Sequence, residues 1–304
     1  MPSRRRFLTT TGASLAVAAF APAYTTAAQD QSSSPKGGAK RLRKTLKLNM
    51  VKGGKTLEQK FAIAHAAGFE GAELDAPGFN IEEANAAAKS TGLIIDGTVN
   101  ADHWNVRHSD PDPAVRAAAL KSCIAGLRAT AAVGADTMLL VPGHGKDGTQ
   151  QEVFERTLTN IQKAIPVAKE VNVKIAIENV WNHFLYDHQG KSDQTANELA
   201  RYIDAFNSPW VGVQFDIGNH WKFGDPAAWI RTLGKRIIKL DVKGFSRGLD
   251  DWTQMSKSDI DWADVRKALE EIDFRGWVAA EMAAGDEAYL KQVSREMDEL
   301  LIVG

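Results

Sequence analysis

Cysteine is almost absent from this sequence, in which Cys123 is the only one among 304 residues. A single cysteine excludes a disulfide within the chain. Cys123 lies in a helical pattern of residues, which favours a buried and inert thiol over a reactive one.

A hydrophobic run long enough to span a membrane is also lacking. The apolar stretch 13–23 is short, and it follows a segment, 3–8, that contains three consecutive arginines. This order, with small-residue cleavage sites near residues 21–28, predicts a twin-arginine export signal over residues 1–28. A membrane anchor is the less favoured alternative, because a spanning helix needs about 20 apolar residues. We therefore expect a flexible lead-in over residues 29–43 and a mature protein that is periplasmic or extracellular.

A strong excess of either charge is missing as well. The formal net charge is −1 at pH 7, and removal of residues 1–28, with three arginines and no acid, changes it to −4. This balance does not indicate a nucleic-acid partner or an anionic membrane surface. We expect neither, and no stable membrane insertion.

Nucleotide-binding motifs are absent too, since no glycine-rich turn follows the first expected strand and no P-loop is present. The sequence instead alternates apolar strand patterns with amphipathic helix patterns. Eight such pairs predict one α/β domain over residues 44–304, a single (β/α)₈ TIM barrel, with an open doubly wound sheet as the alternative. The expected strands are 45–51, 71–76, 93–100, 137–141, 174–182, 211–218, 237–244 and 277–282, and the expected helices are 56–67, 81–90, 112–134, 149–172, 195–206, 225–235, 261–272 and 286–301.

Four of the expected strands carry a carboxylate near their C-terminal ends: Glu178, Asp216, Asp241 and Glu281. A buried parallel strand is normally apolar throughout, so these acids are out of place on folding grounds. Side chains alternate along a strand, and barrels bind ligands at the C-terminal ends of their strands. All four carboxylates should therefore point into one mouth.

Four carboxylates in one mouth repel one another unless a cation lies among them. All-oxygen ligation suits a hard divalent ion, so we expect Mn²⁺ or Mg²⁺, with Zn²⁺ or Co²⁺ as further options. The alternative is a set of ion pairs that merely seals the barrel, with Lys239 and Lys243 as partners of the acids.

The segments around these acids are similar to those of a known family. They read GFEGAEL at Glu73, AIENVWN at Glu178, VGVQFDIGN at Asp216, IIKLDVKGF at Asp241 and GWVAAEM at Glu281. With them the chain resembles the sugar phosphate isomerase/epimerase family, which has a xylose-isomerase-like TIM barrel. Within that family it is most similar to hexulose-6-phosphate isomerase-like and ketose 3-epimerase-like members.

The resemblance implies a role for each acid. The family holds a divalent metal with a Glu, an Asp, a His and a Glu, which implies Glu178, Asp216 and Glu281 as ligands. Asp241 stands where the family has histidine, and we expect it to be the fourth ligand, with Lys243 offsetting part of its charge. The family's two glutamates also act as acid and base, so Glu178 and Glu281 are the expected catalytic residues.

Further residues at the same end of the barrel are candidates for substrate binding. Some epimerase relatives place a substrate-contacting arginine where this chain has Arg247; a solvated surface arginine is the alternative. Glu73 resembles a recurrent family glutamate, either a substrate contact or a buried partner of Lys47 or Lys239. The other candidates, some of which could instead only shape their loops, are His103, His144, Trp181, Asn182, His220 and Lys243.

These features predict isomerisation or epimerisation of a small carbohydrate, by proton transfer next to a carbonyl through an enediolate. Because export makes a phosphorylated sugar an awkward substrate, we expect a free sugar, a keto-sugar or a glycoside derivative. Three alternatives stay open: a lyase or hydrolase of an oxidised glycoside, a non-catalytic sugar-binding barrel, and a DNA-repair endonuclease, which needs additional histidine ligands and a basic face. A homo-oligomer is an open option.

Overall fold

The computed structural model describes residues 41–302. The predicted export signal and residues 29–40 of the predicted lead-in lie outside the described residues. Strand β1 (Leu42–Leu46) begins within the predicted lead-in, so the barrel starts two residues before the predicted boundary at residue 44. The second half of the expected first strand is a short 3₁₀ turn, Leu48–Met50.

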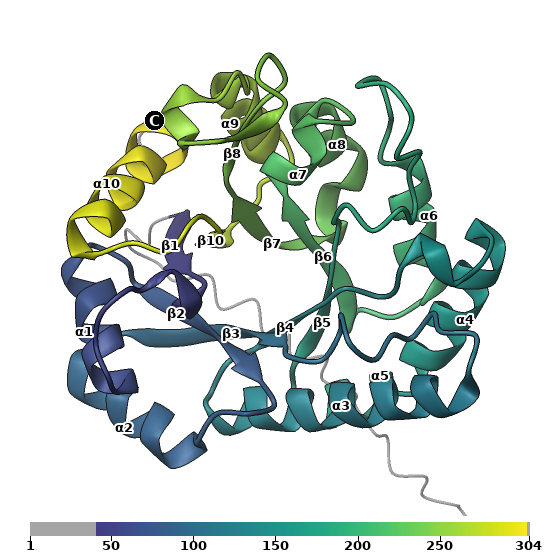
Figure 1. Cartoon of the computed structure of the whole chain (residues 1–304), viewed down its shortest axis with the longest axis horizontal. Coiled ribbons are helices and arrows are strands. Elements are labelled where there is room, and N and C mark those ends of the chain that lie inside the picture. Colours follow the sequence, from purple (N-terminus) through teal and green to yellow (C-terminus); the bar gives the residue numbers. More distant parts are fainter. Residues whose placement is uncertain (1–40, 303–304) are drawn as a thin grey trace, which may run out of the picture. The chain divides into compact units, whose positions relative to one another are not determined.

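Eight parallel strands form a nearly closed barrel, which confirms the predicted fold (Figure 1). A bridge between Lys47 and Glu73 joins the first and last strands of the pairing order, so two charged residues complete the closure. In that order the strands are β1, β10 (Gly276–Ala280), β7 (Ile237–Val242), β6 (Val211–Asp216), β5 (Lys174–Glu178), β4 (Thr137–Leu140), β3 (Ile94–Asn100) and β2 (Gly71–Ala76).

Helices surround this barrel (Figure 1). Most begin after an Asp, Asn or Thr whose side chain accepts a hydrogen bond from a backbone N–H of the first turn, as at Thr56, Thr149 and Asp286. The helices are α1 (Leu57–Ala66), α2 (Ile81–Thr91), α3 (Pro113–Ala132), α4 (Gln150–Gln162), α5 (Ile165–Glu170), α6 (Asn197–Ala205), α7 (Ile217–Trp221), α8 (Pro226–Leu233), α9 (Trp262–Glu271) and α10 (Glu287–Met297).

The strands alternate between two environments, as the period of two requires. Their outward side chains, such as Ile177, Phe215 and Leu240, are buried in a hydrophobic layer between strands and helices. Inward polar side chains contact one another inside the barrel, and each is at most 3% exposed: Thr45, Glu73, Asp96, Gln214, Lys239 and Asp241.

Three local elements differ from the predicted ones. The expected helix 149–172 is two helices, α4 and α5, because Pro166 has no N–H to donate to the preceding turn. Helix α7 follows β6 directly, since Asp216 caps it by accepting a hydrogen bond from the Asn219 N–H at 2.9 Å. Between β7 and α9 the chain forms an antiparallel hairpin of β8 (Gly244–Ser246) and β9 (Asp251–Thr253), whose strands are too short to show a period.

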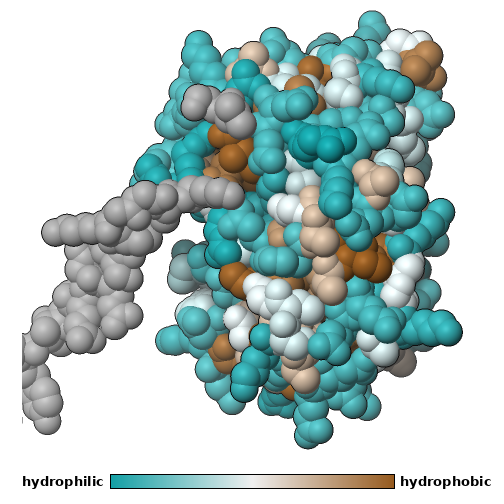
Figure 2. Space-filling model, turned by 90° about the vertical axis from the view of Figure 1, so that its left-hand side faces the viewer, coloured by the Kyte–Doolittle hydropathy of each residue, from teal (hydrophilic) through white to brown (hydrophobic). Residues whose placement is uncertain are grey.

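The outer face that carries α1, α2 and α10 is mainly hydrophilic, with hydrophobic side chains in small separate patches (Figure 2). No helix among residues 41–302 is both long and apolar enough to cross a membrane. Cys123 is fully buried in α3, and burial raises the pKa of its thiol to about 12. The predicted burial of the thiol is therefore confirmed, and the raised pKa is consistent with the predicted low reactivity.

Candidate active site

Three of the four predicted metal ligands meet at the C-terminal mouth of the barrel. Glu178 and Asp216 end β5 and β6, and Glu281 follows β10, where its N–H donates to the Val242 carbonyl at 3.1 Å. One carboxylate oxygen from each acid lies within 4.8 Å of the others. Glu178 and Asp216 are buried and Glu281 is half-buried. We call these three side chains the carboxylate triad.

Lys243 places an ammonium group within the carboxylate triad. Its Nζ lies 2.8 Å from Asp216 Oδ2 and 2.7 Å from Glu281 Oε2. Burial alone would lower the pKa of Lys243, but the carboxylates of Asp216 and Glu281 raise it above its ordinary value. Lys243 is therefore a fixed positive charge at the centre of the site.

One ammonium does not balance the negative charge of the triad. Burial raises the pKa of Glu178 well above its ordinary value, and the nearby carboxylates, Glu281 first, raise it further. Burial also raises the pKa of Asp216 to about 6, in spite of Lys243. Burial alone would raise the pKa of Glu281 as well. The ammonium groups of Lys243 and Lys47 outweigh this effect and leave the pKa of Glu281 below its ordinary value.

The partners of Asp241 lie outside the carboxylate triad. Its Oδ1 accepts a hydrogen bond from Gln214 Nε2 at 2.8 Å, and its Oδ2 lies 3.1 Å from Lys47 Nζ. Burial raises the pKa of Asp241 to about 8. The prediction that Lys243 is the partner of Asp241 is therefore wrong. Lys243 pairs with Asp216 and Glu281, and Lys47 pairs with Asp241 instead.

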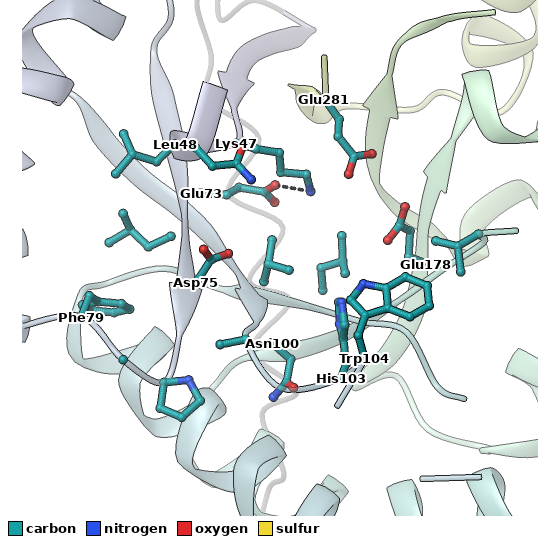
Figure 3. A pocket seen from close by; sticks show the side chains of 18 of the residues that line it. Lys47, Leu48, Glu73, Asp75, Phe79, Asn100, His103, Trp104, Glu178 and Glu281 are labelled. Carbon is teal, nitrogen blue, oxygen red and sulfur yellow. Dashed lines mark ion pairs between the residues drawn. The ribbon is translucent and has the colours of Figure 1, made fainter. Parts of the chain in front are cut away.

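Glu73 is the buried partner of both lysines considered for it. Its Oε2 lies 2.5 Å from Lys47 Nζ (Figure 3). Its Oε1 lies 2.5 Å from Lys239 Nζ. Lys239 also pairs with Asp96. Although burial opposes them, Lys239 and Lys47 lower the pKa of Glu73 to about 2. With both oxygens engaged, Glu73 fixes Lys47 at the mouth.

The residues of the mouth fit a divalent cation. The triad offers oxygen donors at mutual distances that one ion can bridge. Within the described residues, Asp216 Oδ2 is buried and accepts no hydrogen bond, although Lys243 Nζ lies near it. Six buried or half-buried carboxylates of the described residues, namely the triad with Glu73, Asp96 and Asp241, lie among the three lysines 47, 239 and 243.

A cavity of about 860 Å³ opens from the triad, and it has the size of an ordinary small-molecule site. Glu178 and Glu281 direct their carboxylates into it (Figure 3). His103 lines it with a neutral ring, because burial lowers its pKa to about 4. His103 Nδ1 accepts a hydrogen bond from the Val141 N–H at 3.3 Å, so its Nε2 carries the proton. We call this the sugar cavity, after the small carbohydrate expected from the sequence; it is also lined by Asp75, Asn100, Trp104, Trp181, Asn219, Lys243 and Trp252.

Asn219 and Trp252 are among the residues of the sugar cavity that were not predicted from the sequence. Asn219 donates from Nδ2 to Glu178 Oε1 at 3.4 Å, and Trp252 stacks on Trp181 with ring centroids 4.8 Å apart. Asn219 lies three residues after Asp216, the spacing of a helix cap, and this spacing could have revealed it. Trp252 lies on the β8–β9 hairpin, for which the sequence carries no strand period.

Two of the predicted loop residues do not line the sugar cavity. His144 stacks on His183 with ring centroids 5.5 Å apart. Asn182 donates from Nδ2 to the Gly143 carbonyl at 2.7 Å. Both side chains thus hold loops together.

His220 and Arg247 are not among the residues that line the cavity either. His220 is 2% exposed, accepts a hydrogen bond from Asn179 at 2.5 Å and packs against Trp229. Arg247 lies over the Trp221 ring at 3.5 Å and donates to the Trp221 carbonyl at 2.5 Å. These contacts favour the interpretation that His220 shapes its loop over the interpretation that it binds substrate.

Curated relatives match this chain only in part. One is an uncharacterized protein of Methanocaldococcus jannaschii, 23% identical over 154 residues, which are 49% of this chain and 51% of the relative. Another is a probable endonuclease 4 of Acholeplasma laidlawii, 28% identical over 140 residues, 45% of each chain. The chain thus spans about half the length of these relatives.

Solved structures are similar over most of the barrel. The 3-keto-D-glucoside 4-epimerase YcjR of E. coli is 16% identical with a TM-score of 0.68, over 86% of this chain and 99% of that one. An L-ribulose 3-epimerase is 18% identical with a TM-score of 0.70, over 85% and 94%. The IolI protein with a bound zinc atom is 14% identical with a TM-score of 0.69, over 85% and 98%. At these identities the likeness shows the fold alone.

A match to a family model shows that the chain belongs to a protein family, beyond sharing its fold. The model described as xylose isomerase-like TIM barrel matches residues 61–300, well over half of the chain. This range includes the whole carboxylate triad and Lys243. The protein belongs to the xylose isomerase-like TIM barrel family.

Proposed function

We propose that this protein is an isomerase or epimerase of a small sugar or keto-sugar, which moves a proton at the carbon next to a carbonyl. The observation that carries the proposal is the pair Glu178 and Glu281, which face one cavity from different strands (Figure 3). A proton transfer that inverts a centre uses one group to remove the proton from one face and another to return it to the opposite face. The epimerase structures on the same fold support this choice.

The surrounding residues supply the rest of the chemistry. Removal of the proton places negative charge on the carbonyl oxygen of the substrate. The Lys243 ammonium lies 2.7 Å from Glu281, close enough to stabilise that charge beside the base. His103 can donate from Nε2 and Asn219 from Nδ2 to sugar hydroxyls in the cavity. The exposed faces of Trp104 and Trp252 offer stacking surfaces for a sugar ring.

Glu178, Asp216 and Glu281 would hold a divalent ion, and Asp241 would support them through Lys47 rather than as a direct ligand. Such an ion, when bound, polarises a carbonyl and stabilises the developing oxyanion by several kcal/mol. The oxygen donors favour Mn²⁺ or Mg²⁺. Lys243 would have to move away from Asp216 and Glu281 for these two carboxylates to hold such an ion.

Unphosphorylated substrates fit the cavity best. Lys47 and Lys243, which line it, are already paired with Glu73, Asp241 and the triad. Little positive charge is therefore left beside the triad to bind a phosphate, and Lys60 is the remaining lysine of the cavity lining. The same proton abstraction would serve a lyase or hydrolase of an oxidised glycoside. An endonuclease function, suggested by the partial match to endonuclease 4, is less favoured because no histidine joins the triad among the described residues.

We also propose that the chain is exported through the twin-arginine route, since its N-terminal sequence has the required order of charged and apolar residues. Replacement of Arg4 and Arg5 by Lys should leave folded precursor inside the cytoplasm. Fractionation of cells that express each form tests this. Normal export of the double variant would contradict the proposal of twin-arginine export.

Product analysis tests the enzymatic proposal. A panel of ketohexoses, ketopentoses and C3-oxidised glucosides should yield at least one epimer or isomer with the wild type. Glu178→Gln and Glu281→Gln are near-isosteric and should each abolish that conversion. Glu287→Gln, at an exposed glutamate that pairs with Lys291, is the matched control and should keep it. Release of an aglycone instead of an isomer would favour the lyase or hydrolase.

A further inference from the structure

A second cavity lies beside the carboxylate triad, on the far side of three residues that also line the sugar cavity. Its volume is about 600 Å³. Lys243, Trp252 and Glu281 line both cavities, so these side chains lie where the two adjoin. A molecule that contacts Glu281 from the sugar cavity is therefore next to the second one.

The second cavity differs in chemistry from the sugar cavity. Lys243 and Glu281 are the charged residues in its lining, and they neutralise each other at 2.7 Å. The rest of the wall is provided by the indole of Trp252, by Met282, Ala283 and Tyr289, and by the segment 253–254 with Gly244. Aromatic and thioether side chains of this kind favour a flat apolar group.

The apolar wall is held in place by packing. A Cβ at Gly285 would meet Tyr289 Cδ1 at 2.1 Å, so only glycine lets the Tyr289 ring lie against the backbone there. Trp252 is stacked on Trp181 and edge-on to Phe245, with ring centroids 5.1 Å apart in the second pair. Trp252 is nevertheless 43% exposed, so part of its ring is free to contact a ligand.

We infer that the substrate is a glycoside, with its sugar ring in the sugar cavity and an apolar, flat aglycone in the second cavity against Trp252, Met282 and Tyr289. This inference rests on the proposed function, which it narrows to one substrate class. A free monosaccharide would leave the second cavity unused, although it adjoins Glu281. An aglycone joined to the sugar fills both cavities across the residues they share.

Binding of two matched probes tests the inference. Calorimetric titration should show that the phenyl β-glucoside oxidised at C3 binds roughly tenfold more tightly than the corresponding methyl glucoside, since its ring buries additional apolar area. Tyr289→Ala and Met282→Ala should remove this preference and leave the affinity for the methyl glucoside unchanged. Ala283→Arg, which fills the second cavity from an exposed position, should do the same without disturbing the core. Leu249→Ala, at the 72% exposed tip of the hairpin, is the control and should keep the preference.

Three outcomes would overturn the inference, and the first two show whether the proposed function falls with it. If the two glucosides bind with equal affinity while a free keto-sugar is still converted, the aglycone site is contradicted. The proposed isomerase or epimerase function is then unaffected. Failure of both glucosides to bind removes the aglycone site and the oxidised glucosides as a substrate class. A phenyl preference that persists in Ala283→Arg also contradicts the inference, because the group would then lie elsewhere.

Discussion

The ammonium of Lys243 lies 2.8 Å from Asp216 Oδ2, in the space between the carboxylates that would bind a metal ion. The lysine thus acts as the internal cation of the carboxylate triad. A divalent ion has to compete with it for the same oxygens. Two properties of the protein should follow from this arrangement: its stability without metal and its metal affinity.

Replacement of Lys243 by Met should destabilise the metal-free protein by about 3–5 kcal/mol, since it leaves buried carboxylates without their partner. The same variant should bind Mn²⁺ more tightly than the wild type, because the competing charge is gone. Urea unfolding with and without Mn²⁺ measures both effects. Lys267→Met, at a 70% exposed lysine, is the control and should change neither. An unchanged Mn²⁺ affinity in Lys243→Met would show that the ion does not enter the triad.

Asp216→Asn and Asp241→Asn should separate a metal ligand from a supporting residue. Asp216 belongs to the triad, and its loss should weaken Mn²⁺ binding by at least roughly 100-fold, more than outer partners usually cost. Asp241 instead pairs with Lys47, and its loss should weaken binding by no more than roughly 10- to 100-fold, the usual cost of an outer partner. Metal titration of the two variants decides. Equal losses would restore Asp241 as a fourth ligand.

Arg247→Met should affect stability more than substrate binding. The Arg247 guanidinium donates to the Trp221 carbonyl at 2.5 Å and to the Gly224 carbonyl at 2.8 Å. Loss of these charge-assisted bonds should cost about 1.5–3 kcal/mol. Thermal unfolding and KM for the identified substrate are the measurements. A large rise in KM with normal stability would return Arg247 to the role of substrate contact.

His108 should make the fold sensitive to acid. It is buried, its Nδ1 accepts a hydrogen bond from Asn160 at 2.8 Å, and burial lowers its pKa to about 3. In the unfolded chain histidine has a pKa of about 6.5, so below that pH the unfolded state takes up a proton that the folded state refuses. The contribution of His108 to stability is complete above about pH 6.5 and is lost as pH falls towards 3.

His108→Gln keeps a hydrogen-bond acceptor and removes this titration. The fall in the free energy of unfolding between pH 7 and pH 5 should be about 2 kcal/mol smaller in the variant than in the wild type. Urea unfolding at the two pH values measures it. The same fall in both proteins would mean that His108 is already charged in the folded state.

The fold could be predicted from the sequence because its causes are local. Strand alternation placed Glu178 and Asp216 in the mouth, and capping residues such as Thr149 and Asp286 marked where helices begin. The partner of Asp241 could not be read in this way. Lys47 and Lys243 are separated by most of the chain, and which of them meets Asp241 depends on how the barrel closes between Lys47 and Glu73.

The hairpin that carries Trp252 is the other feature that the sequence does not reveal. Its strands have three residues each, too few for a period of two to appear. The cause of its position is tertiary: a Cβ at Gly244 would meet the Gln254 carbonyl oxygen at 2.4 Å, so the two strands approach closely at a glycine. The aromatic wall of the cavity therefore could not be predicted from the sequence.

Proton transfer by Glu178 and Glu281 is the central claim, and conversion of the identified keto-sugar in deuterium oxide tests it most directly. If a carboxylate removes the proton next to the carbonyl and exchanges it with solvent, the product must carry deuterium at that carbon, as NMR will show. Glu178→Gln and Glu281→Gln should show neither conversion nor exchange. Full conversion by the wild type without deuterium in the product would indicate a hydride shift and would contradict the account.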